Sequence, residues 1–209
     1  MRPIPESGRL TVCFAHPSYR LAERFAQRNT GIDHFQVWNL DDLKARIPEA
    51  DALVCSGLWR NELVALAPRL AFLQSVSAGT DQYSRDALGA AGIRAASAQG
   101  VNERAVAEHA IALILAIARK IPEARDHQAA KKWRPMIGEL SRREDELGGK
   151  TVVIVGMGRI GSRLATLARA FDMKTIGVKR DVANGAAAAD KVCRSGNCSM
   201  PSARRTSSC

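Results

Sequence analysis

The first hundred residues alternate short apolar runs with amphipathic segments. The apolar runs have the length of buried strands. They lie at residues 10–15, 35–38, 50–57, 70–77 and 93–97. Helical periodicity follows three of them, around residues 19–29, 40–47 and 85–92, and Gly92 closes the last of these segments. This alternation is typical of a parallel sheet wrapped by helices, and it predicts a flavodoxin-like lobe over residues 1–101.

The period changes after residue 101. Apolar residues then recur every three or four positions, which indicates one face of a helix of about five turns. The residues of this stripe are Val106, Ala110, Leu113, Ile114, Ile117 and Ile121. Asn102 suits the N-cap of the helix, and Pro122 predicts its end or a kink. A long helix of this kind commonly crosses from one α/β lobe to the next, and the polar segment 123–146 then leads back to the surface.

Residues 151–178 follow a strand–turn–helix–strand pattern. The apolar run TVVIV precedes glycines in G-x-G-x-x-G spacing, and MKTIGV forms the second strand. In dinucleotide-binding domains these glycines allow a tight turn, close approach of a pyrophosphate and close packing of the helix, whose N-terminus faces the phosphates. The residues expected to contact the cofactor here are Gly156, Gly158, Arg159, Ile160 and Gly161. The pattern predicts an incomplete Rossmann lobe that binds NAD(P) over residues 102–192, and the competing interpretation is a glycine turn in an unrelated α/β unit.

The residues after the second strand bear on the choice of cofactor. Where an acidic side chain would hold the ribose of NAD, this sequence has Lys179 and Arg180, and two cations suit the 2′-phosphate of NADP. Asp181 is the nearest acid. The two cations are equally typical of solvated charges at a strand end. The cofactor is therefore expected to be NAD or NADP, with NADP favoured.

Composition and charge exclude several classes of protein. The net charge is +10, and four of these charges come from Lys191, Arg194, Arg204 and Arg205. The remaining charges form no basic stripe and no nucleic-acid-binding motif is present, so we expect no nucleic-acid partner. The longest apolar block, residues 110–118, is far short of the roughly 20 residues that cross a bilayer, and no signal peptide precedes the first strand. We therefore expect a soluble, cytoplasmic protein with no membrane partner.

The cysteines fall into two groups. Cys13 and Cys55 lie in apolar runs, where a free cysteine usually acts as a small buried hydrophobe. Cys193, Cys198 and Cys209 have no common zinc spacing and no histidine nearby, so we expect no metal site.

Taken together, these segments resemble the D-isomer-specific 2-hydroxyacid dehydrogenases, the phosphoglycerate dehydrogenase-like family. The similar segments are residues 73–82 (LQSVSAGTDQ), 100–119 and 146–178, and Trp133 also matches. The resemblance implies a two-lobed homodimeric enzyme that transfers hydride between NAD(P)H and a small 2-oxo or 2-hydroxy acid. It also implies that the backbone at Ser77, Ala78 and Gly79 holds the substrate carboxylate. Glyoxylate, hydroxypyruvate and phosphoglycerate-type acids all remain open as substrates.

The resemblance further implies a catalytic histidine, a glutamate that orients it and an arginine that binds the substrate. In the family all three lie later in the chain than this sequence reaches. Among the four histidines present, His16 follows the first strand but has no evident carboxylate partner. His109 is expected to pack within its helix, and His34 and His127 are expected to lie at the surface. No catalytic residue is assigned, and we expect weak or absent cofactor binding and no measurable turnover.

The last segment, residues 193–209, changes in character. It is rich in Ser, Arg and Cys and contains no Leu, Ile, Val or aromatic residue, so we expect it to be disordered and to add no core strand. A family member truncated by a frameshift near residue 192 is the favoured interpretation. The alternative is a non-catalytic scaffold that senses a cofactor or docks another protein.

Overall fold

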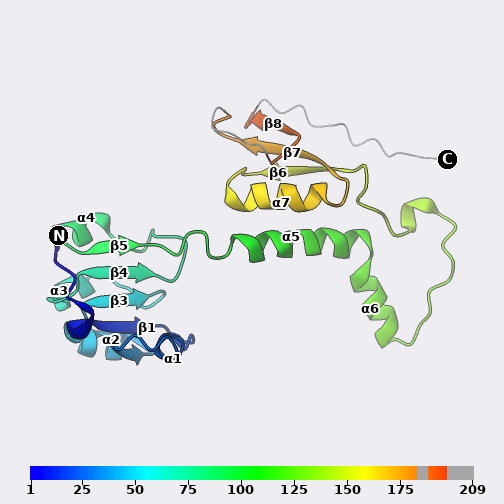
Figure 1. The fold of residues 1–209 in the computed structure, drawn as a ribbon. Coiled ribbons are helices and arrows are strands. Elements are labelled where there is room, and N and C mark those ends of the chain that lie inside the picture. The colour runs from blue at the N-terminus through cyan, green and yellow to red at the C-terminus, as the bar shows by residue number, and fades with distance from the viewer. Residues whose placement is uncertain (183–187, 197–209) are drawn as a thin grey trace. The chain divides into compact units, whose positions relative to one another are not determined.

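The computed structural model describes residues 1–182 and 188–196. Its chain divides into two compact units, Met1–Val101 and Asn102–Cys209, and each unit has a parallel sheet of its own (Figure 1).

Unit 1 is built on a five-stranded parallel sheet in the order β2-β1-β3-β4-β5. The strands are β1 (Thr11–Ala15), β2 (Asp33–Val37), β3 (Ala52–Cys55), β4 (Phe72–Ser75) and β5 (Arg94–Ala96). All five predicted strands are therefore confirmed, and their order is that of the flavodoxin-like sheet.

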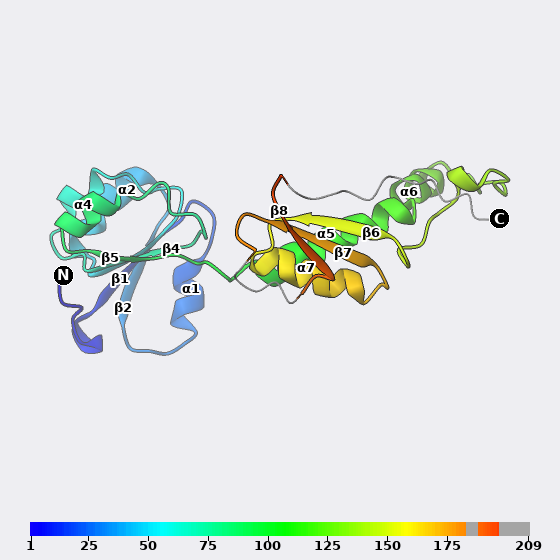
Figure 2. The ribbon, with the colours of Figure 1, turned by 90° about the horizontal axis from the view of Figure 1, so that it is seen from above.

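Helices cover both faces of this sheet. They are α1 (Leu21–Ala26), α2 (Leu40–Arg46), α3 (Leu63–Leu66) and α4 (Arg85–Ala90), with 3-10 turns η1 (Ser7–Arg9) and η2 (Ile47–Glu49). In Figure 2, α1 lies on one side of the sheet and α2 and α4 lie on the other. The short α3 was not predicted, because its four residues carry too little periodicity to be seen in the sequence.

The main core of unit 1 lies under α2, α3 and α4. Alternate strand residues such as Cys13, Leu53 and Leu73 point into it and are fully buried. Burial is the main cause that raises the pKa of both the Cys13 and the Cys55 thiols to about 12, so these thiols stay protonated. The prediction that the two cysteines act as small buried hydrophobes is confirmed.

Asp51 joins three strands at the amino end of the sheet. Its carboxylate, which is 4% exposed, accepts the Thr11 N–H at 2.9 Å and pairs with the Arg69 guanidinium at 2.8 and 3.1 Å. Its backbone oxygen accepts the N–H of Ala71 at 2.8 Å. One buried acid therefore fixes where β1, β3 and β4 begin.

We predict that Asp51→Ala lowers the free energy of unfolding of unit 1 by about 2–3 kcal/mol. The variant leaves the Thr11 N–H without its acceptor in a partly buried site, whereas Arg69 is half exposed and can be solvated. Urea unfolding followed by circular dichroism measures this change. The exposed Asp41 provides the control, because Asp41→Ala should cost less than about 0.5 kcal/mol. Equal costs for the two variants would contradict the assignment.

Unit 2 places helices beside a three-stranded parallel sheet in the order β6-β7-β8. Its elements are α5 (Glu103–Ala118), α6 (Ile121–Ala129), η3 (Leu140–Arg142), β6 (Thr151–Val155), α7 (Arg159–Arg169), β7 (Lys174–Lys179) and β8 (Lys191–Arg194). The predicted strand–turn–helix–strand pattern is confirmed by β6, α7 and β7.

The buried face of α5 differs from the predicted one. The side chains that α5 packs against α7 come from Ala107, Ile111, Ile114, Leu115 and Ala118. In the predicted stripe, Val106, Leu113 and Ile117 are 44, 51 and 76% exposed. Residues 110–118 are apolar all round the helix, so periodicity alone does not select the face that is buried.

The ends of α5 also depart from expectation. Asn102 precedes the helix, but its side chain makes no capping hydrogen bond. The helix ends at Ala118, and Lys120 takes a left-handed backbone conformation with φ of 51°. Pro122 lies in the first turn of α6, where a proline is tolerated, so it begins a second helix instead of ending the first.

The expectation that no strand extends beyond residue 192 was wrong. Strand β8 includes Cys193 and Arg194, and it pairs with β7 through Val178↔Cys193 and Lys179↔Arg194. An edge strand is held by backbone hydrogen bonds and does not need large apolar side chains, and Cys193 is small enough to be buried. The predicted tail from residue 197 to residue 209 lies outside the described residues, as do Cys198 and Cys209.

Candidate functional site

The glycine turn lies between β6 and α7. Gly156 has a φ of 101°, a conformation that side chains rarely adopt, and its N–H donates to the Val178 oxygen at 2.8 Å. Gly158 occupies the N-cap of α7 without a side-chain cap, and space around its α-carbon is open. The first N–H groups of α7 have no partner within the helix. They face this open space with the positive end of the helix dipole, an arrangement that fits a pyrophosphate.

Close packing holds this turn in place. A β-carbon on Gly161 would overlap the carbonyl oxygen of Gly156, so only glycine lets α7 approach β6 here. A second contact of this kind, missed in the sequence, is made by Gly177 on β7, where a β-carbon would overlap the Met157 side chain. Met157 is 8% exposed and fills the space under the turn. The signal for this contact was a glycine inside a strand, which often marks close approach of another group.

Charged side chains surround the turn. Arg159 at the start of α7 pairs with Glu103 of α5 at 3.1 Å, so its charge is partly neutralised. Ile160 is 41% exposed. Arg180 is exposed beyond the end of β7. The register of β7 and β8 places Arg194 beside Lys179, and this third cation was not predicted from the sequence.

Asp190 anchors the start of β8. Its carboxylate accepts hydrogen bonds from the Thr175 N–H at 2.8 Å and the Thr175 hydroxyl at 2.9 Å. The bond from the backbone N–H is the main cause that holds the pKa of Asp190 below its ordinary value. This contact fixes β8, and with it Arg194, against β7.

The predicted carboxylate loop follows β4 in unit 1. The N–H of Ser77 donates to the Ser75 hydroxyl at 3.1 Å, and the Ser77 hydroxyl lies 2.6 Å from that of Ser56. Within the described chain, the N–H groups of Ala78 and Gly79 have no acceptor, and both residues are exposed. Two of the three predicted residues thus offer an open N–H to a carboxylate, and Ser77 contributes its hydroxyl.

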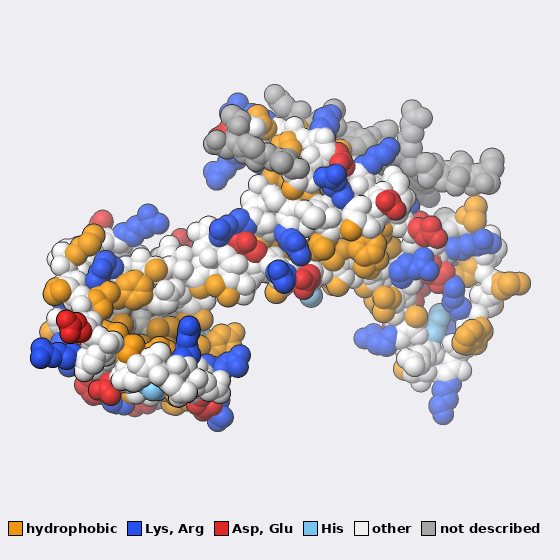
Figure 3. Space-filling model, in the orientation of Figure 1, with side chains coloured by type: hydrophobic (Ala, Val, Ile, Leu, Met, Phe, Trp, Pro, Cys, Tyr) orange, Lys and Arg blue, Asp and Glu red, His pale blue; other side chains and the backbone are white. Residues whose placement is uncertain are grey.

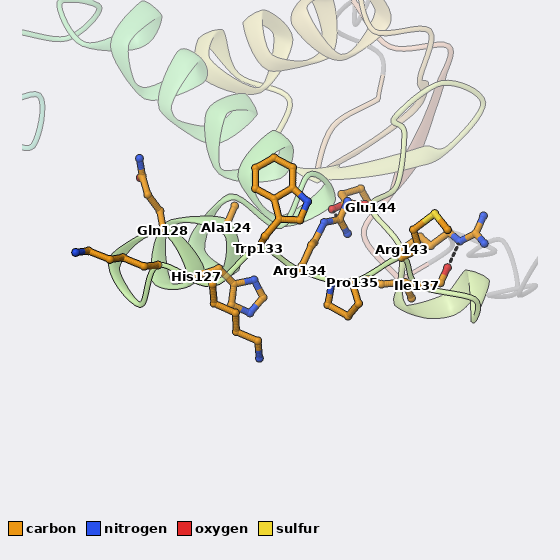
Figure 4. A pocket seen from close by; sticks show the side chains of 12 residues that line it. Ala124, His127, Gln128, Trp133, Arg134, Pro135, Ile137, Arg143 and Glu144 are labelled. Atoms are coloured by element: carbon orange, nitrogen blue, oxygen red, sulfur yellow. Dashed lines mark hydrogen bonds and ion pairs between the residues drawn. The ribbon is translucent and has the colours of Figure 1, made fainter.

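Two hollows in the described part of the chain bear on the search for a binding site. One of about 450 Å³ adjoins the carboxylate loop and is lined by Ala78, Thr80, Arg85, Ser97 and Gln99 among others, of which Arg85 was not anticipated. Another of about 810 Å³ lies between α6 and the loop after it, beside Trp133 and Met136 (Figure 4). None of the predicted site residues lines this second hollow.

No histidine in the described part of the chain pairs with a carboxylate. Among residues 1–182 and 188–196, none of the four histidines hydrogen-bonds a carboxylate. The same residues hold no cluster of side chains able to bind a metal, and no helix long and apolar enough to span a membrane.

Comparison with known proteins relates this chain to one family. Residues 111–202 match the family described as "D-isomer specific 2-hydroxyacid dehydrogenase, NAD binding domain". The D-3-phosphoglycerate dehydrogenase of Mycobacterium bovis is 38% identical over 133 residues, which are 63% of this chain and 24% of that protein. The glyoxylate reductase of Aeropyrum pernix is 37% identical over 150 residues, 69% of this chain and 44% of that protein.

A solved structure is similar over nearly the whole chain. A D-isomer specific 2-hydroxyacid dehydrogenase family protein from Aeromonas salmonicida superimposes with a TM-score of 0.72 at 23% identity, and the match covers 89% of this chain and 58% of that one. At this identity the likeness concerns the fold. The chain spans less than half the length of each of these two curated relatives.

We predict that Gly161→Ala lowers the free energy of unfolding of unit 2 by about 3 kcal/mol, because the added methyl group forces α7 away from the Gly156 carbonyl. Gly158→Ala is the matched control, since its methyl group enters open space, and it should cost no more than about 1 kcal/mol. Thermal or urea unfolding of both variants tests the prediction. A Gly161→Ala variant as stable as Gly158→Ala would show that the close contact is not needed.

Proposed function

The chain belongs to the D-isomer-specific 2-hydroxyacid dehydrogenase family, and from this premise we propose that it binds NAD(P) and a small 2-oxo or 2-hydroxy acid as part of an oxidoreductase. In this proposal, the loop at Ser77, Ala78 and Gly79 holds the acid by its carboxylate, and the glycine turn holds the pyrophosphate. A bound nicotinamide would supply the hydride chemistry, and the residues described here would bind and orient the two ligands.

The geometry of the glycine turn is the observation that carries this proposal. Gly156 is left-handed, Gly158 leaves open space at the start of α7, and Gly161 lets the helix approach the strand. Each glycine thus meets a separate requirement of a pyrophosphate-binding turn. Three glycines at this spacing in an unrelated turn would not be expected to meet all three.

We favour NADP over NAD as the cofactor. The support is the group of cations at the carboxyl end of β7 and β8, which comprises Lys179, Arg180 and Arg194. A 2′-phosphate placed there would form charge-assisted hydrogen bonds, which are stronger than neutral ones.

We predict that NADPH binds more tightly than NADH and that Gly158→Ala weakens both, because its methyl group fills the space of the pyrophosphate. Arg180→Ala should weaken NADPH about 10-fold and leave NADH unchanged. Titration followed by the fluorescence of the reduced nicotinamide measures these affinities. We expect all of them to be weak, since the turn and the cations contact only part of the cofactor.

Arg163→Ala is the control for this experiment, because Arg163 is exposed on α7 away from the strand end. Unchanged binding in Gly158→Ala would contradict the proposed pyrophosphate site. An equal loss of NADPH and NADH in Arg180→Ala would contradict the preference for NADP while leaving the site intact.

The proposal assigns this chain a binding role and no turnover of its own. The acid–base histidine of the family needs an orienting glutamate, and His16, His34, His109 and His127 have no carboxylate partner among the described residues. Glyoxylate, hydroxypyruvate and phosphoglycerate-type acids are all compatible with a loop that binds only the carboxylate.

A second candidate function, that of a protein-interaction scaffold, is favoured by the exposed apolar surface of unit 2. Val106, Leu113 and Ile117 lie on one face of α5, and Trp133 and Met136 are almost fully exposed on the loop after α6. Figure 3 shows hydrophobic side chains gathered over the C-terminal half of α5 and the start of α6. Such apolar surface commonly marks a protein interface.

We propose a second copy of this chain as the occupant of this surface. The stripe on α5 carries no charge, so two copies of it can pack together about a two-fold axis without burying a charged group. The resemblance to a family of homodimers supports the same partner.

We predict that the chain sediments as a dimer, a species of twice the 22.6 kDa mass of one chain. Ile117→Glu should convert this dimer to a monomer, because burying an unpaired carboxylate at an interface is costly. Ala112→Glu places the same charge on an exposed position of α5 off the stripe and should leave the dimer intact. Analytical ultracentrifugation distinguishes these states. A monomeric wild-type chain with intact circular dichroism would refute self-association.

A further inference from the structure

His16 is the one histidine at the ligand-binding edge of unit 1. It follows the last residue of β1, and its N–H donates to the Val37 oxygen at 3.2 Å, which holds the backbone at the end of the sheet. In open α/β sheets, ligands bind outside the carboxyl ends of the strands. The proposed carboxylate loop lies at the same edge, after β4.

The ring of His16 is fixed in one orientation. Its Nδ1 atom accepts hydrogen bonds from the N–H groups of Ser18 at 3.0 Å and Tyr19 at 2.8 Å. The ring also stacks on that of Tyr19, with centroids 3.9 Å apart and planes 2° from parallel. A ring held by two hydrogen bonds and one stacked face has little freedom to turn.

These contacts also determine where the proton lies. Because Nδ1 accepts two hydrogen bonds, the proton of the neutral ring must be on Nε2. Partial burial lowers the pKa of His16, which favours the same neutral form. Nε2 is therefore a donor, and no acceptor for it occurs in the described part of the chain.

The strand register places His16 at the same end of the sheet as the carboxylate loop. Ala15 pairs with Cys55, so His16 and Ser56 take the next positions on neighbouring strands, and the Ser56 hydroxyl contacts that of Ser77 at 2.6 Å. Strands β1 and β4 are separated only by β3, a span of about 10 Å between their ends. A three-carbon acid and one histidine side chain together bridge such a span.

We propose that His16 is a specificity-determining residue, whose Nε2–H donates to an uncharged oxygen on the third carbon of the acid. The inference rests on the proposed function, because it requires the carboxylate to be held by the loop at residues 77–79. The His16 donor selects 2-oxo acids that carry a hydroxyl on the carbon next to the keto carbon over those that carry only hydrogen on that carbon.

The charge at this edge favours a neutral substituent over a phosphate. His16 and Ser56 offer neutral donors. The guanidinium of Arg60, on the loop after β3, donates to the oxygens of Gly57 at 3.1 Å and Trp59 at 2.7 Å. Both bonds are made by Nη1, and they tie the guanidinium to its own loop.

The test compares hydroxypyruvate with pyruvate, which differ only in the hydroxyl on the third carbon. Binding to the 209-residue chain is followed by NMR, through the amide signals of Ala78 and Gly79. We expect hydroxypyruvate to bind about 3- to 10-fold more tightly than pyruvate, the range for one net hydrogen bond. Phosphohydroxypyruvate should gain no further affinity.

Two substitutions separate recognition from a structural role. His16→Asn keeps an oxygen near the place of Nδ1 for the Ser18 and Tyr19 N–H groups but removes the distal donor. We expect it to fold normally and to bind both acids with equal affinity. His16→Gln keeps an amide donor near the place of Nε2 and loses the proximal acceptor, so it should retain part of the preference for hydroxypyruvate. His34→Asn, on β2 of the same unit, is the control and should match the wild type.

The outcomes distinguish the inference from the proposal beneath it. If neither acid shifts the Ala78 and Gly79 signals, the carboxylate site fails, and the role of His16 fails with it. If both acids bind and His16→Asn keeps the wild-type preference, the carboxylate site stands and the role of His16 is refuted. Tighter binding of phosphohydroxypyruvate than of hydroxypyruvate would also refute it.

Discussion

The organisation of unit 2 depends on the close contact between Gly161 and the carbonyl oxygen of Gly156. Without a β-carbon at Gly161, α7 lies directly against the end of β6, and Met157 fits beneath the turn against Gly177. The position of α7 then provides the apolar surface on which α5 packs through Ile111 and its neighbours. The same contact aims the N-terminus of α7 at the open space beside Gly158, so the packing of unit 2 and the proposed pyrophosphate site depend on the same contact.

Sequence patterns predicted the strands well because buried parallel strands are continuous apolar runs with little ambiguity. All five strands of unit 1 and the β6–α7–β7 pattern of unit 2 occur where the sequence placed them. The face of α5 was not predictable, since a helix that is apolar all round has no preferred side until its partners are known. Strand β8 was missed because backbone pairing with β7 decides its structure, and pairing between distant residues leaves no local pattern.

The candidate site shows the same division between local and long-range information. The residues of the glycine turn were evident because spacing within a few positions determines their role. Gly177, Arg194 and Arg85 were not, since each acquires its place through a strand register or through packing against a distant segment. The carboxylate-binding role of the Ala78 and Gly79 N–H groups was inferred from a family resemblance. Only the structure showed that the Ser77 N–H is already bonded to the Ser75 hydroxyl.

The two units differ in the electrostatic character of their ligand-binding edges. In unit 2 the cations Lys179, Arg180 and Arg194 gather at the ends of β7 and β8, which suits a phosphate. In unit 1 the groups at the ends of β1, β3 and β4 are mainly neutral donors, and they hold their positions through bonds to one another and to the backbone. Neutral donors gain less binding free energy from a charged ligand than cations do. They nevertheless reject a molecule that lacks the matching acceptor, because the donor is then buried without a hydrogen-bond partner. In the proposed function, charge in unit 2 would therefore supply affinity for the cofactor, while fixed neutral donors in unit 1 would discriminate among small acids that differ by one oxygen.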